Sequence, residues 1–317
     1  MYEIIRNIRF VKSKSLQGQG TVIATIFKTV GSSYRKQWTQ MVVAEDMTYE
    51  GALSGGCVER EVLRQANKLF FTKGRSQFEY DGTEKLGCKG RIWVCLEFLE
   101  KDRGLKLCEV VEKVHRERTA FTHGIGDDGN PYTYFAINNN IYSFNKSFDP
   151  NDDHITRIVK PQNRVVIIGG EFDSFILART TQWAGFDTHL IVYKDYVKPS
   201  FDPSYTIKRV QSDDIGQYCS WDDKTALILM THSMERDYTY LRQLLEKPLY
   251  FIGALGPKDR RDELIIKCRN ELDLNQNEEL QLEKLRGPVG IHINAGTPEE
   301  IAISIVSELI QVFSHAH

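Results

Sequence analysis

The stretch RVVIIGGEFDSFILARTTQWAGFDTHLIVY, residues 164–193, decides the fold of the C-terminal half. Its first part, RVVIIGG, is typical of a strand that is buried in a parallel sheet and runs into a glycine turn. SFILARTTQWAGF then has the apolar spacing of a helix and stops at Gly185, and HLIVY has the composition of the next strand. This order of strand, turn, helix and strand indicates a doubly wound α/β sheet.

The same alternation continues toward the C-terminus. TALILMT, residues 225–231, is a further buried strand, YTYLRQLLE is the helix after it, and LYFIGALG is a strand that ends in a glycine loop. The last helix is expected to begin at TPEE. There Thr297 is a good N-cap, Pro298 suits the first helical position and Glu300 completes a capping box. We therefore predict an α/β fold with a C-terminal Rossmann-like doubly wound parallel sheet.

The first half has a different pattern and is predicted to be an α+β domain. β-rich segments such as TVIATIFKTV alternate with polar loops, and helical spacing follows Cys57 and returns near residues 105–116. A polar, proline-bounded segment, PNDDHITRIVKPQ, indicates a domain boundary near Lys160. We expect an N-terminal domain over residues 1–115, a β-rich connecting region over 116–160 and the Rossmann-like domain over 161–317.

Composition argues against several classes of function. The 317 residues carry a net charge of −2 and no long run of Lys and Arg, which disfavours nucleic-acid binding. No apolar stretch approaches the roughly 20 residues that span a bilayer. The N-terminal segment MYEIIRNIRFVKSKS lacks the apolar core of a signal peptide. We expect a cytoplasmic protein with neither a nucleic acid nor a membrane as partner.

The six cysteines include no C-x-x-C pair, so a zinc ribbon is not expected, and most are predicted to be small buried residues. Cys57 differs, because SGGC directly precedes a helical pattern. Gly55 and Gly56 let the backbone approach a ligand closely. The free N–H groups and the dipole of a helix start favour a thiolate and also an anion such as phosphate. The alternative is a buried cysteine in a tight turn, and the local pattern does not decide between the two.

Cys88 lies in LGCKG, where flanking glycines make burial harder than in a strand or helix. Whether Cys57 and Cys88 meet depends on the fold. If they do, they could carry a sulfur atom, hold a soft metal or form a redox disulfide. Basic residues near these loops, including Arg35 and Arg60, could pair with phosphate, although a solvated surface is the commoner role of each.

The glycine turn after RVVII departs from a dinucleotide-binding fingerprint. Gly169 and Gly170 follow the strand, but the second and third positions of G-x-G-x-x-G fall at Glu171 and Ser174. A carboxylate at the second position repels a pyrophosphate. Tyr193 stands where an acidic residue would bind the ribose. Tight NAD(P) binding in the usual pose is therefore not expected, although the fold prediction does not depend on these side chains.

Other candidate residues lie where predicted strands end. Thr231 and His232 directly follow TALILM, at the edge where open α/β sheets bind ligands, and a histidine there could act as an acid, a base or a ligand. Gly253 ends the next strand, and Arg260 opens the helix after it, where it could meet an anion. The alternatives are a structural histidine and a charged first turn that faces water.

Together these segments resemble the XdhC/CoxI family of xanthine dehydrogenase accessory factors over almost the whole chain. The shared motifs are GSSYR, MVV, GALSGGCVE, LGCKG, MTHSMERD, YFIGALG and GPVGIHINAGTPEEIAISI. The order of SGGCVE and G-x-x-I-x-A-x-TPEEIA is quite specific. The chain departs from the family at Ser33-Tyr34, at Trp38-Thr39-Gln40, where Gly-Ala commonly precedes the Met, and in the Rossmann turn.

The resemblance implies a maturation chaperone without turnover of its own. Such a protein binds the molybdenum cofactor, as molybdopterin or its nucleotide form, and works with a cysteine desulfurase to exchange an oxo ligand for sulfur. It then delivers the cofactor to the apo form of a molybdenum hydroxylase of the xanthine dehydrogenase type. The alternatives are an NAD(P)-binding oxidoreductase and a non-catalytic docking scaffold for the hydroxylase, and the sequence leaves open whether the chain is a homodimer.

The resemblance also assigns residues. Cys57 and Cys88 match the two motif cysteines, and Cys57 is the first choice for a catalytic contact with the cofactor or its sulfur. No residue is assigned as a ligand of a protein-bound metal. The candidate cofactor-binding residues are Arg35, Gly55, Gly56, Cys57, Glu59, Cys88, Gly169, Gly170, Thr231, His232, Gly253 and Arg260.

Overall fold

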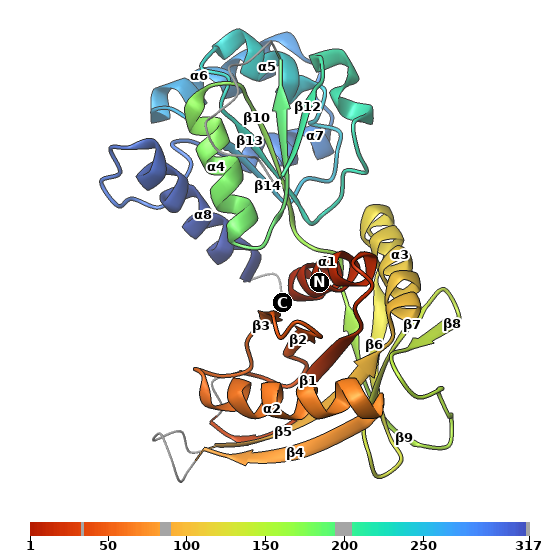
Figure 1. The fold of residues 1–317 in the computed structure, drawn as a ribbon. Helices are drawn as coiled ribbons and strands as arrows, with labels where there is room; N and C mark the ends of the chain where they lie inside the picture. The colour runs from red at the N-terminus through yellow and green to blue at the C-terminus, as the bar shows by residue number, and fades with distance from the viewer. Residues whose placement is uncertain (33–34, 83–89, 194–204, 315–317) are drawn as a thin grey trace. The chain divides into compact units, whose positions relative to one another are not determined.

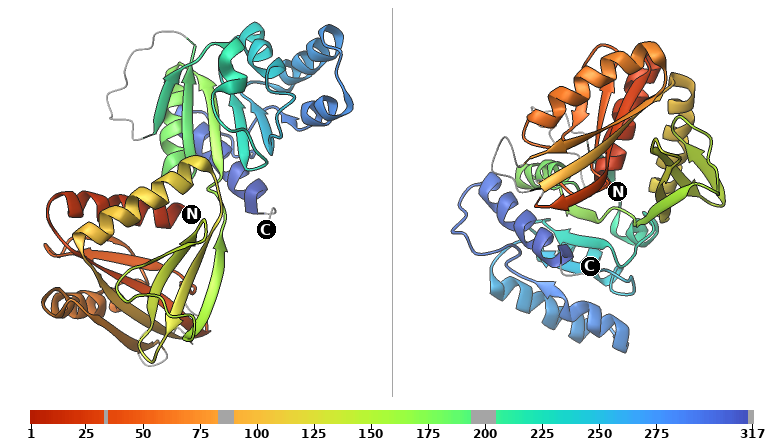
Figure 2. Two further views of the ribbon diagram at one scale, coloured as in Figure 1. Left: turned by 90° about the vertical axis from the view of Figure 1, so that its right-hand side faces the viewer. Right: turned by 90° about the horizontal axis from the view of Figure 1, so that it is seen from below.

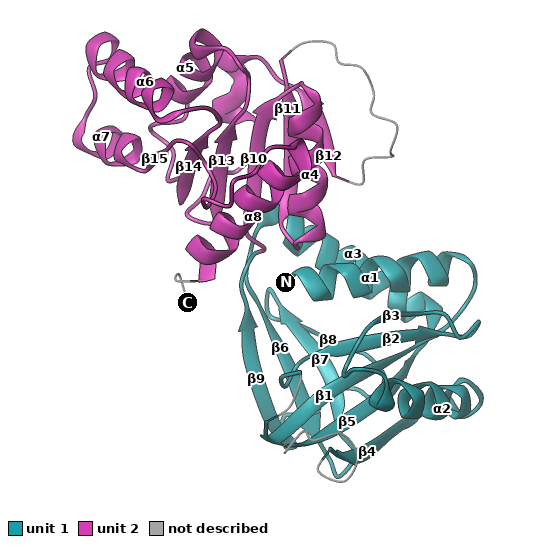
Figure 3. Cartoon of the chain, turned by 90° about the vertical axis from the view of Figure 1, so that its left-hand side faces the viewer, with its two compact units in different colours: residues 1–161 teal, residues 162–317 magenta. Residues whose placement is uncertain are grey.

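The computed structural model describes residues 1–32, 35–82, 90–193 and 205–314. The chain forms two compact units, residues 1–161 and 162–317 (Figure 3). Within the described part of the chain, none of the helices is both long and apolar enough to pass through a bilayer.

Unit 2, residues 162–317, is built on a six-stranded sheet in the order β12-β11-β10-β13-β14-β15, with every neighbouring pair parallel (Figure 3). Figure 1 shows this sheet from another side, with β10, β12, β13 and β14 labelled. The strands are β10 (Arg164–Gly169), β11 (Asp187–Val192), β12 (Thr206–Arg209), β13 (Thr225–Leu229), β14 (Phe251–Ala254) and β15 (Leu285–Arg286). The predicted doubly wound parallel sheet is confirmed. The chain order reverses between β10 and β13, which makes their carboxyl ends the switch point of the sheet.

Helices cover both faces of this sheet, which explains the unbroken apolar run of β10. Val165 and Ile167 pack toward one face with α4 (Phe172–Trp183) and α8 (Pro298–Ser314). Val166 and Ile168 pack toward the other. The helices on that second face are α5 (Met234–Arg242), α6 (Lys258–Glu271) and α7 (Gln276–Glu283), and a short 3-10 helix, η1, spans Ser212–Gln217. A strand with both faces buried has no polar side to alternate with its apolar side.

The predicted start of the last helix is confirmed. Glu300 Oε2 accepts hydrogen bonds from the backbone N–H groups of Gly296 and Thr297, at 2.7 and 3.1 Å. The Glu300 N–H in turn donates to Thr297 Oγ1 at 3.2 Å. These are the contacts of a capping box, and α8 begins at Pro298.

Unit 1, residues 1–161, holds two antiparallel sheets and three helices among its described residues, which confirms the predicted α+β character. The first sheet has the order β3-β2-β1-β5-β4 and the second β8-β7-β6-β9. The first comprises β1 (Thr21–Gly31), β2 (Gln40–Ala44), β3 (Tyr49–Gly51), β4 (Arg75–Asp81) and β5 (Gly90–Leu99). The second comprises β6 (Phe121–Asp127), β7 (Tyr132–Ile137), β8 (Asn140–Ser143) and β9 (Asp153–Val159).

The helices of unit 1 divide between the two faces of the first sheet. α1 (Tyr2–Leu16) and α3 (Lys101–Glu117) lie side by side (Figure 2) and share a core with the second sheet. α2 (Cys57–Thr72) packs against the opposite face of the first sheet, on Val22, Ala24 and Ile26. In the chain, α2 follows β3. The SGGC motif, residues 54–57, ends at the first residue of α2.

Candidate functional site

The SGGC motif forms an open turn at the start of α2. The helix begins at Cys57, as the motif predicts, and Gly56 has φ of 122°, a backbone conformation that residues with a Cβ rarely adopt. A methyl carbon added at Gly55 or Gly56 would find no heavy atom within 4 Å. Gly56 therefore shapes the turn, and the space next to both glycines is open.

The Glu59 side chain stabilises this turn through hydrogen bonds. Its buried carboxylate accepts hydrogen bonds from the backbone N–H groups of Leu53, Ser54 and Gly56, at 2.8, 2.6 and 2.9 Å, and from the Ser54 hydroxyl at 2.6 Å. Burial alone would raise the pKa of Glu59, but these hydrogen bonds outweigh it and the pKa is lowered. Both carboxylate oxygens thus serve the turn. The contact of Glu59 with a cofactor stays a prediction.

Replacing Glu59 with Gln should loosen the turn in a pH-dependent way. Hydrogen bonds to a charged acceptor contribute about 1.5–3 kcal/mol, so we expect the free energy of unfolding to fall by about 1–2 kcal/mol at neutral pH. Because the folded pKa is lowered, this difference is fully present above pH about 4.3 and shrinks as the pH falls through the folded pKa. Thermal unfolding across pH checks this. Glu109→Gln, at an exposed position of α3 in the same unit, is the control, and an equal loss in both variants would refute the role of Glu59.

Cys57 is half-buried, and Arg60 Nη2 lies 3.7 Å from its sulfur. The cysteines in strand and helix interiors differ from it. Burial raises the pKa of Cys108 to about 12 and that of Cys268 to about 11. It also raises the pKa of Cys95 well above its ordinary value. Among the described cysteines, Cys57 alone combines a helix start, partial exposure and a neighbouring guanidinium.

The other predicted residues of the first half are less well defined. Arg35 Nη1 lies 3.3 Å from Glu3 Oε1 of α1, so this cation has a carboxylate partner. Cys88 falls outside the described residues. Its meeting with Cys57 therefore stays a prediction.

The glycine turn of unit 2 keeps its packing role without its usual third glycine. A methyl carbon added at Gly169 would lie 2.6 Å from the Ser174 Cβ. Ser174 is fully buried, and its hydroxyl donates to the Glu171 carbonyl at 2.7 Å. A small residue at 174 therefore still lets α4 approach β10 closely. Glu171 is exposed as the N-cap of α4, and Gly170 is buried beside it.

His232 pairs with Asp173 at the switch point of the sheet. Its Nε2 lies 2.8 Å from Asp173 Oδ2. The two residues follow β13 and β10, the strands between which the chain order reverses. His232 has φ of 54° and is about half exposed, with a side-chain exposure of 49%. A histidine–carboxylate pair at this edge can hold or transfer a proton toward a ligand. His232 was a candidate from the sequence, but Asp173 was not. The sequence showed Asp173 only as one residue of the segment that follows the glycine turn.

Thr231 and Arg260 are both bound to Asp237, a buried residue that the sequence showed only as the end of MTHSMERD. The Thr231 hydroxyl donates to Asp237 Oδ1 at 2.6 Å, and Arg260 Nη2 donates to Oδ2 at 2.6 Å. A methyl carbon added at Gly253 would lie 2.5 Å from Val289 Cγ2, so a neighbouring side chain fills the space beside that glycine. These three residues contact other residues of unit 2. Their binding of a cofactor stays a prediction.

A hollow of about 350 Å³ lies next to this region in unit 2. Its walls are mainly Leu255–Pro257 and Pro288–Ala295, with Ile301 and Ser304 of α8. Most of these side chains are apolar, and His292 and Asn294 add polar groups. The motif GPVGIHINAG supplies one wall, and this motif was the sequence signal that could have located the hollow.

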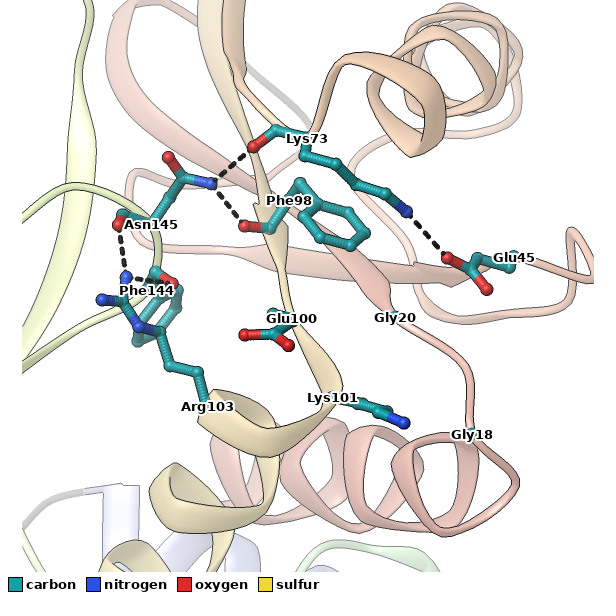
Figure 4. A pocket seen from close by; sticks show the side chains of 10 residues that line it. All are labelled: Gly18, Gly20, Glu45, Lys73, Phe98, Glu100, Lys101, Arg103, Phe144 and Asn145. Carbon is teal, nitrogen blue, oxygen red and sulfur yellow. Dashed lines mark hydrogen bonds and ion pairs between the residues drawn. The ribbon is translucent and has the colours of Figure 1, made fainter.

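A larger hollow of about 570 Å³ lies in unit 1 and was not predicted (Figure 4). Lys73 Nζ lies 4.1 Å from the Phe98 ring centroid and 3.1 Å from Glu45 Oε1. Arg103 and Asn145 close another side through hydrogen bonds to backbone carbonyls. Charges of both signs line the space, and its residues come from positions 18–145, so no local pattern could have revealed it.

Two family models match the chain. Residues 15–81 match the XdhC and CoxI family, and residues 165–309 match the XdhC Rossmann domain. A probable xanthine dehydrogenase subunit from Bacillus subtilis is 25% identical, over 92% of this chain and 92% of that protein. The molybdenum cofactor insertion chaperone PaoD of Escherichia coli is 25% identical, over 97% of this chain and 88% of that protein.

A solved structure shares the whole architecture. It is described as a xanthine dehydrogenase from Bacillus halodurans, and its sequence is 27% identical to this chain. The superposition has a TM-score of 0.79 and covers 98% of this chain and 96% of the other. Both units are therefore found together in a related protein.

Proposed function

The chain belongs to the XdhC and CoxI family, and from this premise we propose that it binds the molybdenum cofactor and assists its insertion into a molybdenum hydroxylase of the xanthine dehydrogenase type. Similarity to a cofactor insertion chaperone over 97% of the chain is the observation that carries the proposal. The cytoplasmic location predicted from the sequence is part of it.

The SGGC turn fits the chemistry of this cofactor. When bound, the cofactor supplies a soft molybdenum centre and an anionic phosphate. Cys57 offers a partly exposed sulfur, which is a soft ligand, and the side of the turn next to Gly55 and Gly56 is open. Arg60 and the start of α2 place positive charge beside that sulfur. In the finer proposal, Cys57 contacts the molybdenum or the sulfur that a cysteine desulfurase supplies.

Insertion can be tested with a purified apo-hydroxylase. Protein loaded with cofactor should restore hydroxylase activity faster than the same amount of free cofactor, because the bound cofactor is protected until transfer. Protein that binds the hydroxylase but carries no cofactor would support the docking scaffold instead. No gain over free cofactor would refute the insertion role.

The NAD(P)-dependent alternative has its own test at the glycine turn. Glu171→Gly removes a carboxylate from the pyrophosphate approach while keeping a residue suited to an N-cap. Repulsion between two charges 4 Å apart in water is about 1 kcal/mol, so dinucleotide affinity should rise about fivefold. Calorimetric titration with NADH checks this, with Glu246→Gly, also in unit 2, as control. Unchanged affinity in Glu171→Gly would show that Glu171 does not face the dinucleotide path.

A further inference from the structure

Three side chains that no motif singled out meet in the interior of unit 1. His123 of β6 and Arg157 of β9 are cross-strand partners in the second sheet. Trp38 reaches them from the connection between β1 and β2 of the first sheet. Its ring centroid lies 4.9 Å from that of His123 and 5.3 Å from Arg157 Cζ. The cluster therefore joins the two sheets. Trp38 follows Arg35 by three positions in the chain.

His123 presents a buried hydrogen-bond donor. Arg157 Nη2 lies 3.3 Å from His123 Nδ1, and a guanidinium can only donate, so Nδ1 accepts and the ring proton of the neutral imidazole sits on Nε2. Burial and the charge of Arg157 hold the pKa of His123 well below its ordinary value, which keeps the ring neutral. His123 is fully buried, and its Nε2 has no hydrogen-bond partner among the described residues. A buried donor without an acceptor costs about 1–3 kcal/mol.

The positive charge of Arg157 is only partly compensated. Its Nε is also buried without a partner, and within the described chain no carboxylate comes within 4.0 Å of its guanidinium. Burial lowers the pKa of Arg157, and the attraction of Glu3 opposes this only in part. Glu3 itself forms an ion pair with Arg35 at 3.3 Å. A half-buried cation in this position favours an incoming anion.

Trp38 is held in an unusual backbone conformation beside these groups. Its φ is 77°, in the left-handed region that bulky residues rarely adopt, and its N–H donates to the Ile26 carbonyl at 2.7 Å. Such strain costs about 1–3 kcal/mol and tends to occur at functional sites. Here it brings the indole ring against His123 and Arg157.

We infer that Arg157, His123 and Trp38 form a binding site for an oxyanion. The guanidinium supplies the counter-charge, the His123 Nε2–H supplies a donor, and the indole ring of Trp38 packs beside both. If the proposed function holds, on which this part of the inference rests, the oxyanion is the phosphate of the pterin cofactor. Arginine suits this ligand because its planar set of donors matches phosphate oxygens.

Inorganic phosphate is the probe, used on purified protein that carries no cofactor. Calorimetric titration should show binding to the wild type and at least about tenfold weaker binding to Arg157→Gln, since a charge-assisted contact contributes about 1.5–3 kcal/mol. Arg91→Gln is the matched control. Arg91 also lies over a tryptophan, 5.8 Å from the Trp93 ring, but it is exposed and pairs with Glu79. Equal affinity in all three proteins, or no binding to the wild type, would overturn the inference.

A second measurement does not require the Arg157 variant to fold. In wild-type protein labelled with ¹⁵N-histidine, phosphate should shift the Nε2 resonance of His123, assigned with a His123→Gln variant. An equal concentration of chloride should leave it unchanged. A spectrum that does not respond to phosphate would exclude the site. Cofactor retention without phosphate binding would overturn this inference and leave the proposed function standing, whereas phosphate binding without cofactor retention would do the opposite.

Discussion

Cys57→Ala should lower retention of the molybdenum cofactor about tenfold or more and leave the fold intact. Loss of a contact worth about 1.5–3 kcal/mol corresponds to this change in affinity. The side chain is half-buried at the first position of α2, where alanine is well tolerated. The free energy of unfolding should therefore change by no more than about 0.5 kcal/mol. Bound pterin per chain after gel filtration is the measurement.

A matched control separates this effect from a general loss of thiol. Cys219 is also half-buried but lies in unit 2, outside the SGGC turn. Cys219→Ala should retain as much pterin as the wild type. Equal retention by all three proteins would remove Cys57 from the site, and equal loss in both variants would point to a non-specific thiol effect.

Asp237→Ala should destabilise unit 2 by about 3–5 kcal/mol, because it leaves the Arg260 charge without its carboxylate and removes one acceptor from the hydroxyl and the backbone N–H of Thr231. Asp237 is 1% exposed, so solvent cannot take the place of its carboxylate. Hydrogen exchange of the β13 amides reports the unfolding of this unit.

The control for Asp237 is a second aspartate–arginine pair of unit 2. Asp213 has a side-chain exposure of 80% and lies 4.0 Å from Arg242. Its replacement by alanine should change the free energy of unfolding by no more than about 0.5 kcal/mol. Similar effects of the two substitutions would mean that burial does not strengthen the dependence of Arg260 on Asp237.

The sequence predicted those features of the fold that depend on local pattern. The run RVVIIGG indicated a strand buried on both faces, and β10 is one. The Thr297–Glu300 motif indicated a capping box, and its hydrogen bonds are present. The glycines before Cys57 indicated a turn into a helix, and α2 begins there. Each of these depends on residues only a few positions apart.

Partners that are distant in sequence could not be predicted in the same way. Thr231 and Arg260 were predicted as cofactor contacts because of their place at the edge of the sheet, and this stays a prediction. Their shared partner, Asp237, was not predicted. The pairing of His232 with Asp173 depends on β10 and β13 being neighbours, which single-strand patterns do not show. Such contacts arise only when the whole sheet is formed.

The molybdenum and pterin content of the wild-type protein, purified from cells that make the cofactor, tests the central claim most directly. We expect both to co-purify with the chain through gel filtration, and the pterin to be absent from protein made in cells that cannot synthesise it. Protein from cofactor-producing cells that carries neither molybdenum nor pterin would contradict the claim.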